Sequence, residues 1–407
     1  MLVLVGAFFQ THIFWSKNVK KTVINKRFAL ALAQLKPNVM WNRTPMNSPL
    51  ILRASSILAG LTITLLLAGW IVPFIQFSSA SQFDFWLVWL LCMIILALPF
   101  SLLEIALAKR SKANPLPALL VLTREADAKP AWRITGWLAA AVMSLVSGGL
   151  LYQSASMVFE GLGHRPAELM GYLSIGLILA GVALSFVPRA ILILVASIAA
   201  IIATILSFVQ MGVGHWQWTA FSLQEWAWAV SLALIATGLG YGMYWQLNAS
   251  QSVEKASKTA LPIWTGQLAG GVMIAMVQGF HGTHTLWLYG IALLAGAAFL
   301  ISLLREQLQA RGLSMVLQWL FVLLGLLLWL VPMQPVLTTL TVILALVVCL
   351  LYAIFSGWMM KISHLRKALN FDQEVVYNLW RIAVRVVIPV AIVVAIMGLI
   401  LGLVLPA

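Results

Sequence analysis

Two places in this 407-residue chain carry residue types able to bind a ligand or a neighbouring helix within otherwise apolar sequence. The first is Glu104, in the segment 87–115, which reads LVWLLCMIILALPFSLLEIALAKRSKANP. A carboxylate within an apolar span is costly, so it normally makes a functional or structural polar contact. Alternatively, Glu104 reaches the membrane surface and pairs with a base such as Lys109. Because proline removes a backbone donor and crowds the preceding turn, we also expect the helix to be disturbed near Pro99.

The second place is the segment 226–250, WAWAVSLALIATGLGYGMYWQLNAS, whose centre has alternating glycines. Each glycine costs up to about 1 kcal/mol relative to alanine within a helix. At membrane depth, non-helical backbone persists only where protein or a cavity satisfies its polar groups. Many secondary transporters build their sites from such interrupted helices. A stripe of small residues for close helix packing is the alternative, but Gly238 and Gly240, two residues apart, do not share a helix face.

Neither a metal site nor an enzyme active site is indicated. Cys92 and Cys349 both lie in apolar segments and are expected to act as small apolar residues. His281 and His284 are close together in a short loop, where interfacial contacts explain them better than a metal ion. We find no Ser/His/Asp constellation and no phosphate-binding loop in a strand–helix context. The sequence therefore predicts no enzyme, no bound metal and no cofactor.

The composition predicts the elements that must position these residues. With 62% hydrophobic and 9% charged residues, the chain is expected to be an integral membrane protein whose main partner is the lipid bilayer. Short connectors separate about eleven apolar segments, each near the roughly twenty residues that a crossing needs. They begin near Ile51, Phe85, Trp132, Glu168, Arg189, Trp226, Leu261, Thr285, Leu313, Val336 and Tyr377. The predicted fold class is an all-α polytopic membrane protein.

Charge alternates between the connectors, so the net charge of +14 does not indicate nucleic-acid binding. Lysine and arginine gather in 17–53, 109–133, 189, 255–258, 305–311 and 361–385. Arg165 is the only lysine or arginine on the other side. By the positive-inside rule the N-terminus is cytoplasmic, and an odd number of helices places Ala407 outside. We expect a multi-pass protein of the plasma membrane, which is the inner membrane in a bacterium.

Residues 1–48 are expected to form a basic cytoplasmic extension that is poorly ordered, and residues 49–407 to form the transmembrane domain. The apolar stretch 1–15 is too short to span a bilayer, and its basic residues follow it, which is the wrong order for a secretory signal. The extension could instead lie on anionic lipid. It could also be translated from upstream of a start at Met46.

The segment 87–115 resembles the second transmembrane helix of the neurotransmitter:sodium symporter family. The matching positions are Ala97, Pro99, Glu104, Lys109, Arg110, Asn114 and Pro115. The sixth span resembles the family's broken sixth helix, through Trp226, Gly238, Leu239, Gly240, Tyr241 and Gly242. The resemblance implies a leucine-transporter-type fold, with a five-plus-five inverted repeat, broken helices one and six, and an appended eleventh helix.

Helix one matches the family in part. Trp70 and Pro73 align with the family's tryptophan and proline, so the partner break is expected at 68–73. The family's Gly-Leu-Gly-Asn element is replaced by apolar residues at 65–68, and its gating arginine by Ile71. The acidic partner of that arginine is also missing, because the segment 336–360 holds no carboxylate.

Other departures concern the ion sites. Leu150 stands where the family has a substrate-contacting tyrosine, and Ala298 and Phe299 stand where its helix eight places sodium-binding hydroxyls. Sodium is a hard cation that needs several oxygen ligands. We therefore expect family-type sodium sites to be degraded. Coupling to sodium or to protons stays open, and Glu104 is the main acid within the spans.

The leading hypothesis is a secondary active transporter that moves a small solute, such as an amino acid or related metabolite, by alternating access. The residues expected to bind this small molecule are Gly69, Trp70, Leu150, Ala236, Gly238, Gly240, Tyr241 and Gly242. Tyr241 is the best single candidate, because the aromatic residue at this place lies beside substrate in the family; a tyrosine packed between helices is the alternative. The competing hypothesis is a non-transporting scaffold or sensor subunit. The oligomeric state is not indicated.

Overall fold

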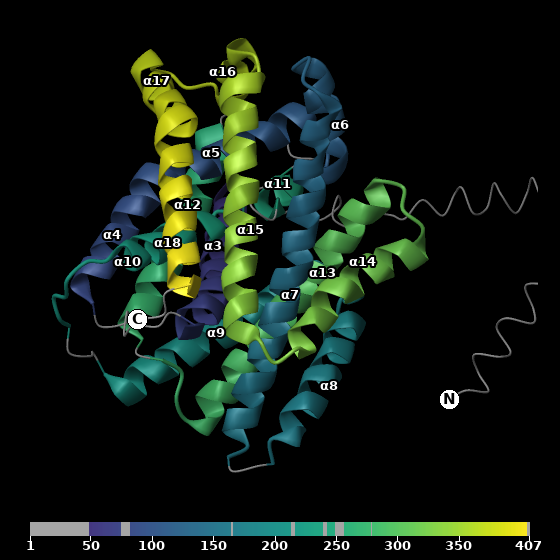
Figure 1. Cartoon of the computed structure of the whole chain (residues 1–407), viewed down its shortest axis with the longest axis vertical. Helices are drawn as coiled ribbons and strands as arrows, with labels where there is room; N and C mark the ends of the chain where they lie inside the picture. The colour runs from purple at the N-terminus through teal and green to yellow at the C-terminus, as the bar shows by residue number, and fades with distance from the viewer. Residues whose placement is uncertain are drawn as a thin grey trace, which may run out of the picture. The chain divides into compact units, whose positions relative to one another are not determined.

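The computed structural model of the chain describes residues 49–74, 82–163, 166–212, 216–238, 242–248, 256–277 and 279–404. Residues 1–48, expected to be an extension, lie outside the described residues. Residues 52–407 group as one compact unit of helices joined by short connectors (Figure 1). Within the described ranges, extended backbone pairs only at an isolated bridge between Gln82 and Gln217.

Each of the five spans expected in the first half of the fold coincides with a helix. They are α3 (Pro49–Ile71), α4 with α5 (Phe83–Cys92, Leu98–Ser111), α7 (Ile134–Gly161), α8 (Glu168–Leu184) and α9 (Arg189–Met211). In the second half the expected sixth span is divided. The helices are α10 and α11 (Leu223–Ile235, Met243–Asn248), α12 (Ala256–Met276), α13 (Thr283–Ala310), α14 (Met315–Leu327), α15 (Gln334–Ile354), and α17 with α18 (Glu374–Ile382, Ile388–Val404). A described helix therefore lies at each of the eleven predicted spans.

The described helices fit a bilayer. Seven of them, some with their adjoining turns, are long and apolar enough to cross it, by length and composition. Three shorter apolar segments are Glu168–Leu184, Leu223–Ile235 and Met315–Leu330. Two further helices, α6 (Pro115–Glu125) and α16 (Ile362–Leu369), belong to basic connectors. The protein is thus a polytopic all-α membrane protein.

Helix two is disturbed before Pro99, as the sequence predicts. A π-helical turn, Met93–Ala97, joins α4 to α5, and the N–H of Leu98 donates to the carbonyl of Met93. The indole of Trp264 donates to the same carbonyl at 2.8 Å, and the indole of Trp380 donates to the Pro99 carbonyl at 3.0 Å. Helices seven and eleven therefore satisfy backbone groups on both sides of the proline.

The most extensive helix packing in the described chain is that of α13 against α7 and against α9. Ser154 on α7 donates to the Gly290 carbonyl on α13 at 2.7 Å, and Ser144 donates to the Val322 carbonyl on α14 at 2.8 Å. Hydroxyl-to-carbonyl bonds of this kind join transmembrane helices at small residues. Helix three is thereby fastened to helices eight and nine, while α15 and α18 lie side by side elsewhere in the unit (Figure 1).

Candidate functional site

The interruption of helix six divides the span into α10 and α11. The α-helix ends at Ile235, and α11 begins at Met243. Gly238 and Gly242 have φ of 79° and 65°, in the left-handed region that glycine adopts without steric cost. The N–H of Met243 donates to the Gly238 carbonyl at 3.2 Å, which closes the turn. The predicted break is confirmed at these two glycines.

Two buried polar side chains satisfy backbone groups that the interruption frees. Gln267 on α12 donates from Nε2 to the Ala236 carbonyl at 2.8 Å, at the end of α10. Glu104 on α5 accepts from the N–H of Trp245 at 2.6 Å, in the first turn of α11. The first N–H groups of a helix have no partner within it, so an acceptor oxygen from another helix satisfies one of them. Glu104 and Gln267 therefore hold the two facing ends of the broken helix.

The burial of Glu104 decides between the two sequence interpretations of this residue. Its exposed fraction is 0%, and among the described residues no lysine or arginine forms an ion pair with it. Lys109 and Arg110 lie further along the same helix, where Arg110 pairs with Glu125 at 2.9 Å. Glu104 thus makes a structural polar contact inside the protein rather than a surface ion pair.

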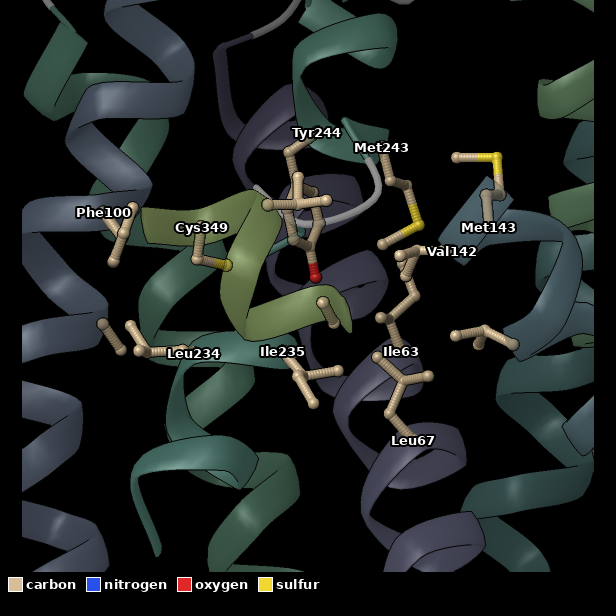
Figure 2. Packing of buried hydrophobic residues seen from close by; sticks show 14 of the residues in the cluster. Ile63, Leu67, Phe100, Val142, Met143, Leu234, Ile235, Met243, Tyr244 and Cys349 are labelled. Atoms are coloured by element: carbon tan, nitrogen blue, oxygen red, sulfur yellow. The ribbon is translucent and has the colours of Figure 1, made fainter. Parts of the chain in front are cut away.

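The glycines of the interruption are also closely packed. A Cβ atom on Gly238 would overlap the ring of Tyr244 and would lie 3.2 Å from Oε2 of Glu104. A Cβ atom on Gly242 would lie 2.5 Å from the ring of Pro115. Figure 2 shows Tyr244 pointing away from α11, with its hydroxyl directed toward the level of Ile235 and Ile63. Both backbone conformation and space therefore require glycine at these positions.

Helix one differs from the expectation of a break at 68–73. The α-helix α3 continues through Gly69 and Trp70 to Ile71, and a single 3₁₀ turn, Val72–Phe74, follows at Pro73. The physical reason is the replacement of the family's Gly-Leu-Gly-Asn by Leu65-Leu66-Leu67-Ala68, because leucine and alanine favour a helix. No carbonyl array of an unwound helix is therefore presented between Pro49 and Ile71.

Tyr289 on α13 is the residue that the sequence interpretation missed. Its hydroxyl donates to the Leu65 carbonyl at 2.8 Å, and its ring stacks on Phe280 at 3.8 Å between centroids. The side chain passes directly over Gly69, where a Cβ atom would overlap the hydroxyl. The sequence does show a tyrosine within an apolar span and a glycine within helix one. The two residues are far apart in the chain, however, so no sequence pattern indicates that Tyr289 packs on Gly69.

Trp70 packs between helices three and nine. It is fully buried, and its ring meets that of Trp329 edge-on at 5.8 Å between centroids. Gly149 on α7 leaves room for the indole, since a Cβ atom there would lie 2.6 Å from it. Trp70 therefore packs on α7 at Gly149, next to Leu150, which is another of the candidate binding residues.

An apolar pocket lies between helices one, three, five, six and eight. The pocket is narrow, and its free interior has room for about one water molecule. Its lining residues are Ile63, Leu66, Leu67, Leu150, Ile193, Met243, Gly296, Phe299 and Leu300. All of them are apolar, and they include two positions at which the chain departs from the symporter family, Leu150 and Phe299. Met243 brings the start of α11 to this pocket.

The described candidate residues fall into three neighbourhoods rather than one cluster. Gly69 and Trp70 lie beside Tyr289 and Trp329. Leu150 lines the apolar pocket. The helix-six positions Ala236, Gly238 and Gly242 contact Gln267, Glu104, Tyr244 and Pro115. Gly240 and Tyr241 lie outside the described residues.

A polar network joins helices five and eight at the end of α13. Arg189, the first residue of α9, forms an ion pair with Glu306 and donates from Nε to the Ser302 hydroxyl at 3.1 Å. Asn114 donates to Glu306 at 3.2 Å, which brings in the connector after helix two. The guanidinium of Arg305 lies over the rings of Phe186 and Trp319, 4.3 and 4.4 Å from their centroids. Charged and cation–π contacts therefore close this end of the helix pair.

At the other end of the spans, the connector before helix six is attached to the start of helix two. Asp84 accepts hydrogen bonds from the hydroxyl of Thr219, the shorter at 2.9 Å. The N–H of Phe83 donates to the Gln217 carbonyl at 3.0 Å, and the ring of Phe83 stacks with that of Trp218 at 5.4 Å. These contacts place the start of α10 relative to α4.

An interrupted helix six, held by helices two and seven beside a pocket between helices one, three and eight, defines a membrane protein with the leucine-transporter-type fold. The solved structure of MhsT in complex with L-phenylalanine is similar to this chain, with a TM-score of 0.61. The two sequences are 15% identical, and the similarity covers 88% of this chain and 98% of that one. No family model and no curated protein sequence matches the chain.

Proposed function

We propose that the protein is a secondary transporter that carries a small solute by alternating access. The observation that carries this proposal is the interrupted helix six. Its two ends are held by Gln267 and Glu104, and its second half opens with Met243 at the apolar pocket. Interrupted helices near the middle of the membrane are how secondary transporters present backbone dipoles to a substrate. Glycine within a helix lowers stability, and helix-forming residues would restore it. The presence of the glycines therefore favours a functional role for the interruption.

An amino acid or related metabolite is the proposed substrate class. The pocket supplies apolar walls for a side chain, while the segment 237–242 would supply backbone groups for a charged or polar end. MhsT, whose structure was solved with L-phenylalanine, supports a solute of this kind. Tyr241 and Gly240 would contact the solute from helix six, Leu150 from helix three. Gly69 and Trp70 would shape the site through their packing on Tyr289 and Trp329.

Binding without family-type sodium sites is proposed for two reasons. Ala298 is buried and apolar, and Phe299 lines the apolar pocket, so helix eight offers no hydroxyl there. Helix one remains α-helical to Ile71, and its Leu65 carbonyl already accepts from Tyr289. Oxygen ligands that a hard cation needs are therefore few around the pocket.

The first experiment is a thermal-unfolding measurement on the purified protein with pools of amino acids, in sodium and again in potassium or choline. A ligand that binds only the folded state raises the melting temperature by mass action. We expect a shift that does not depend on sodium. A shift in sodium alone would contradict the proposed loss of sodium sites, and no shift with any pool in any cation would contradict the amino-acid class.

A non-transporting membrane subunit is the second candidate, favoured by the continuous helix one. Reconstitution separates the two functions. A transporter moves its stabilising ligand into proteoliposomes, or exchanges it with labelled ligand, whereas a sensor binds the ligand without moving it. We expect uptake above that of protein-free liposomes; ligand binding with no uptake or exchange would favour the sensor.

The proposed topology places the N-terminus in the cytoplasm and Ala407 outside, in a plasma membrane. The basic connectors support it, because they alternate with connectors that hold few bases. Labelling of single cysteines introduced at Lys129 and at Glu160, with a membrane-impermeant reagent on intact cells, tests it. Only the cysteine at position 160 is expected to react; the reverse pattern would invert the topology.

A further inference from the structure

One π-helical turn ends helix ten, and another lies within helix eleven, between α17 and α18. They are Phe355–Met359 and Ala383–Val387, and they pack against each other. Arg385, within the second turn, donates from Nε to the carbonyl of Gly357, and its guanidinium lies 5.2 Å from the ring centroid of Trp358. A Cβ atom on Gly357 would lie 2.9 Å from the Arg385 side chain. π turns are rare and occur frequently at functional sites.

A small pocket, open to its surroundings, lies beside these turns. Arg381 and Arg385 both line it, one helical turn apart, together with Ser356, Tyr377 and Trp380. Ser356 is 1% exposed, and its hydroxyl has no hydrogen-bond partner among the described residues. A buried hydroxyl without a partner is unfavourable unless a ligand supplies one. The pocket therefore holds two positive charges and an unused hydroxyl.

No acid of the described chain neutralises these arginines. Neither Arg381 nor Arg385 forms an ion pair with a described carboxylate. The acid at the start of helix eleven, Glu374, pairs with Arg366 at 3.3 Å. An anion that enters the pocket would therefore meet two guanidinium groups that no described carboxylate neutralises, and guanidinium groups bind phosphate in a bidentate manner.

The surroundings of the pocket favour a lipid over a soluble anion. Helix eleven exposes apolar side chains next to Arg381 and Arg385: Ile382 and Val386 are 56% and 52% exposed. Further along the same helix Val390 is 58% exposed, so an apolar surface continues toward the centre of the membrane. Trp358, 58% exposed, lies beside Arg385, as aromatic residues do at membrane interfaces. A phosphate in the pocket could carry its acyl chains along this surface.

We propose that this pocket binds the phosphate of an anionic phospholipid, with Arg381, Arg385 and Ser356 on the headgroup and the acyl chains along α18. The adjoining connector carries Lys361 and Lys367, so the lipid belongs to the cytoplasmic leaflet under the proposed topology. Basic pockets between transmembrane helices bind anionic headgroups in this way.

The test uses the full-length protein, delipidated in a neutral detergent. Binding of phosphatidylglycerol and of phosphatidylcholine is measured by native mass spectrometry and by the shift in melting temperature. The wild type is expected to bind phosphatidylglycerol more tightly. Arg381→Gln should weaken that binding about fivefold, equivalent to about 1 kcal/mol for one basic residue at the membrane surface. The matched control is Arg311→Gln, which removes an exposed arginine after α13 and should leave the affinity unchanged.

A second variant separates a headgroup contact from a structural role. Ser356→Ala removes the unpartnered hydroxyl, so without lipid its melting temperature should equal or exceed that of the wild type. Its shift with phosphatidylglycerol should be smaller. Equal affinity for the two lipids, or equal losses in Arg381→Gln and Arg311→Gln, would overturn the proposal. Displacement of the lipid by millimolar inorganic phosphate, with the same stabilisation, would assign the pocket to a soluble anion instead.

Discussion

The Glu104 carboxylate accepts a hydrogen bond of 2.6 Å from the backbone N–H of Trp245, 141 positions away in the chain. The bond joins the two unusual features of the sequence, the acid in helix two and the glycines in helix six. Trp245 also donates from its indole to the Ala113 carbonyl at 3.0 Å, beyond the end of the same helix two. The first turn of α11 is therefore bonded to helix two at Glu104 and to the residues just after that helix at Ala113. Its position depends in part on Glu104.

Glu104→Ala should destabilise the protein by about 1–3 kcal/mol, because it leaves a buried N–H without an acceptor. Glu104→Gln keeps an acceptor oxygen and should lose less. Thermal unfolding in detergent measures both. Glu125→Ala is the matched control: Glu125 forms a partly exposed ion pair with Arg110, of a kind worth about 0–1 kcal/mol. Equal losses in Glu104→Ala and Glu125→Ala would contradict the capping role.

Gly240→Leu should abolish ligand binding while the protein remains inserted and folded. The reason is the proposed placement of the solute against the interrupted backbone of helix six, where a leucine would occupy the site. Ligand-induced stabilisation is the measurement. Gly176→Leu on α8 is the control, since a Cβ atom there would meet open space. Unchanged binding by Gly240→Leu would show that helix six is not the site.

Gly69→Ala should destabilise the protein by about 1–3 kcal/mol, because the added methyl group overlaps the Tyr289 hydroxyl and forces the helices apart. Tyr289→Phe removes that hydroxyl and the bond to Leu65, at about 0.5–1.5 kcal/mol. The double variant should lose less than the sum of the two, which a double-mutant cycle of unfolding free energies measures. Additive losses would mean that Gly69 and Tyr289 do not meet.

A chain that begins at Met46 should insert and unfold like the full chain. The eleven spans all begin after this residue, and the core contacts described above lie within 52–407. Melting temperatures of the two chains, measured in the same detergent, should agree. A clear loss of stability in the shorter chain would assign the basic extension a structural role.

The positions of the helices and the break in helix six followed from local sequence. Apolar length sets the spans, and Gly238 and Gly242 supply the left-handed backbone that no other residue adopts freely. Pro99 likewise predicts a disturbance that the structure resolves as a π turn. Each of these features depends on residues close together in the chain.

Helix one shows why the other features of the fold and the candidate site could not be predicted from the sequence. Trp70 and Pro73 matched a family with a broken helix, yet the helical preference of the leucines before them keeps α3 continuous to Ile71. The Tyr289 hydroxyl bonds to the Leu65 carbonyl, 224 positions away in the chain, and the Gln267 side chain bonds to the Ala236 carbonyl, 31 positions away. Hydropathy and spacing indicate that a polar side chain is buried, but not which carbonyl it reaches.

The contact between α3 and α12 limits how this fold can move. A Cβ atom on Gly60 would overlap the Ile263 carbonyl, one on Gly266 would overlap the Ile57 carbonyl, and one on Gly270 would lie 2.7 Å from the Leu61 carbonyl. The two backbones therefore touch at these three glycines without side chains between them. Bending helix one alone would separate this joint, whereas tilting both helices together would preserve it. Any rocking motion should therefore carry helices one and seven together as one rigid unit.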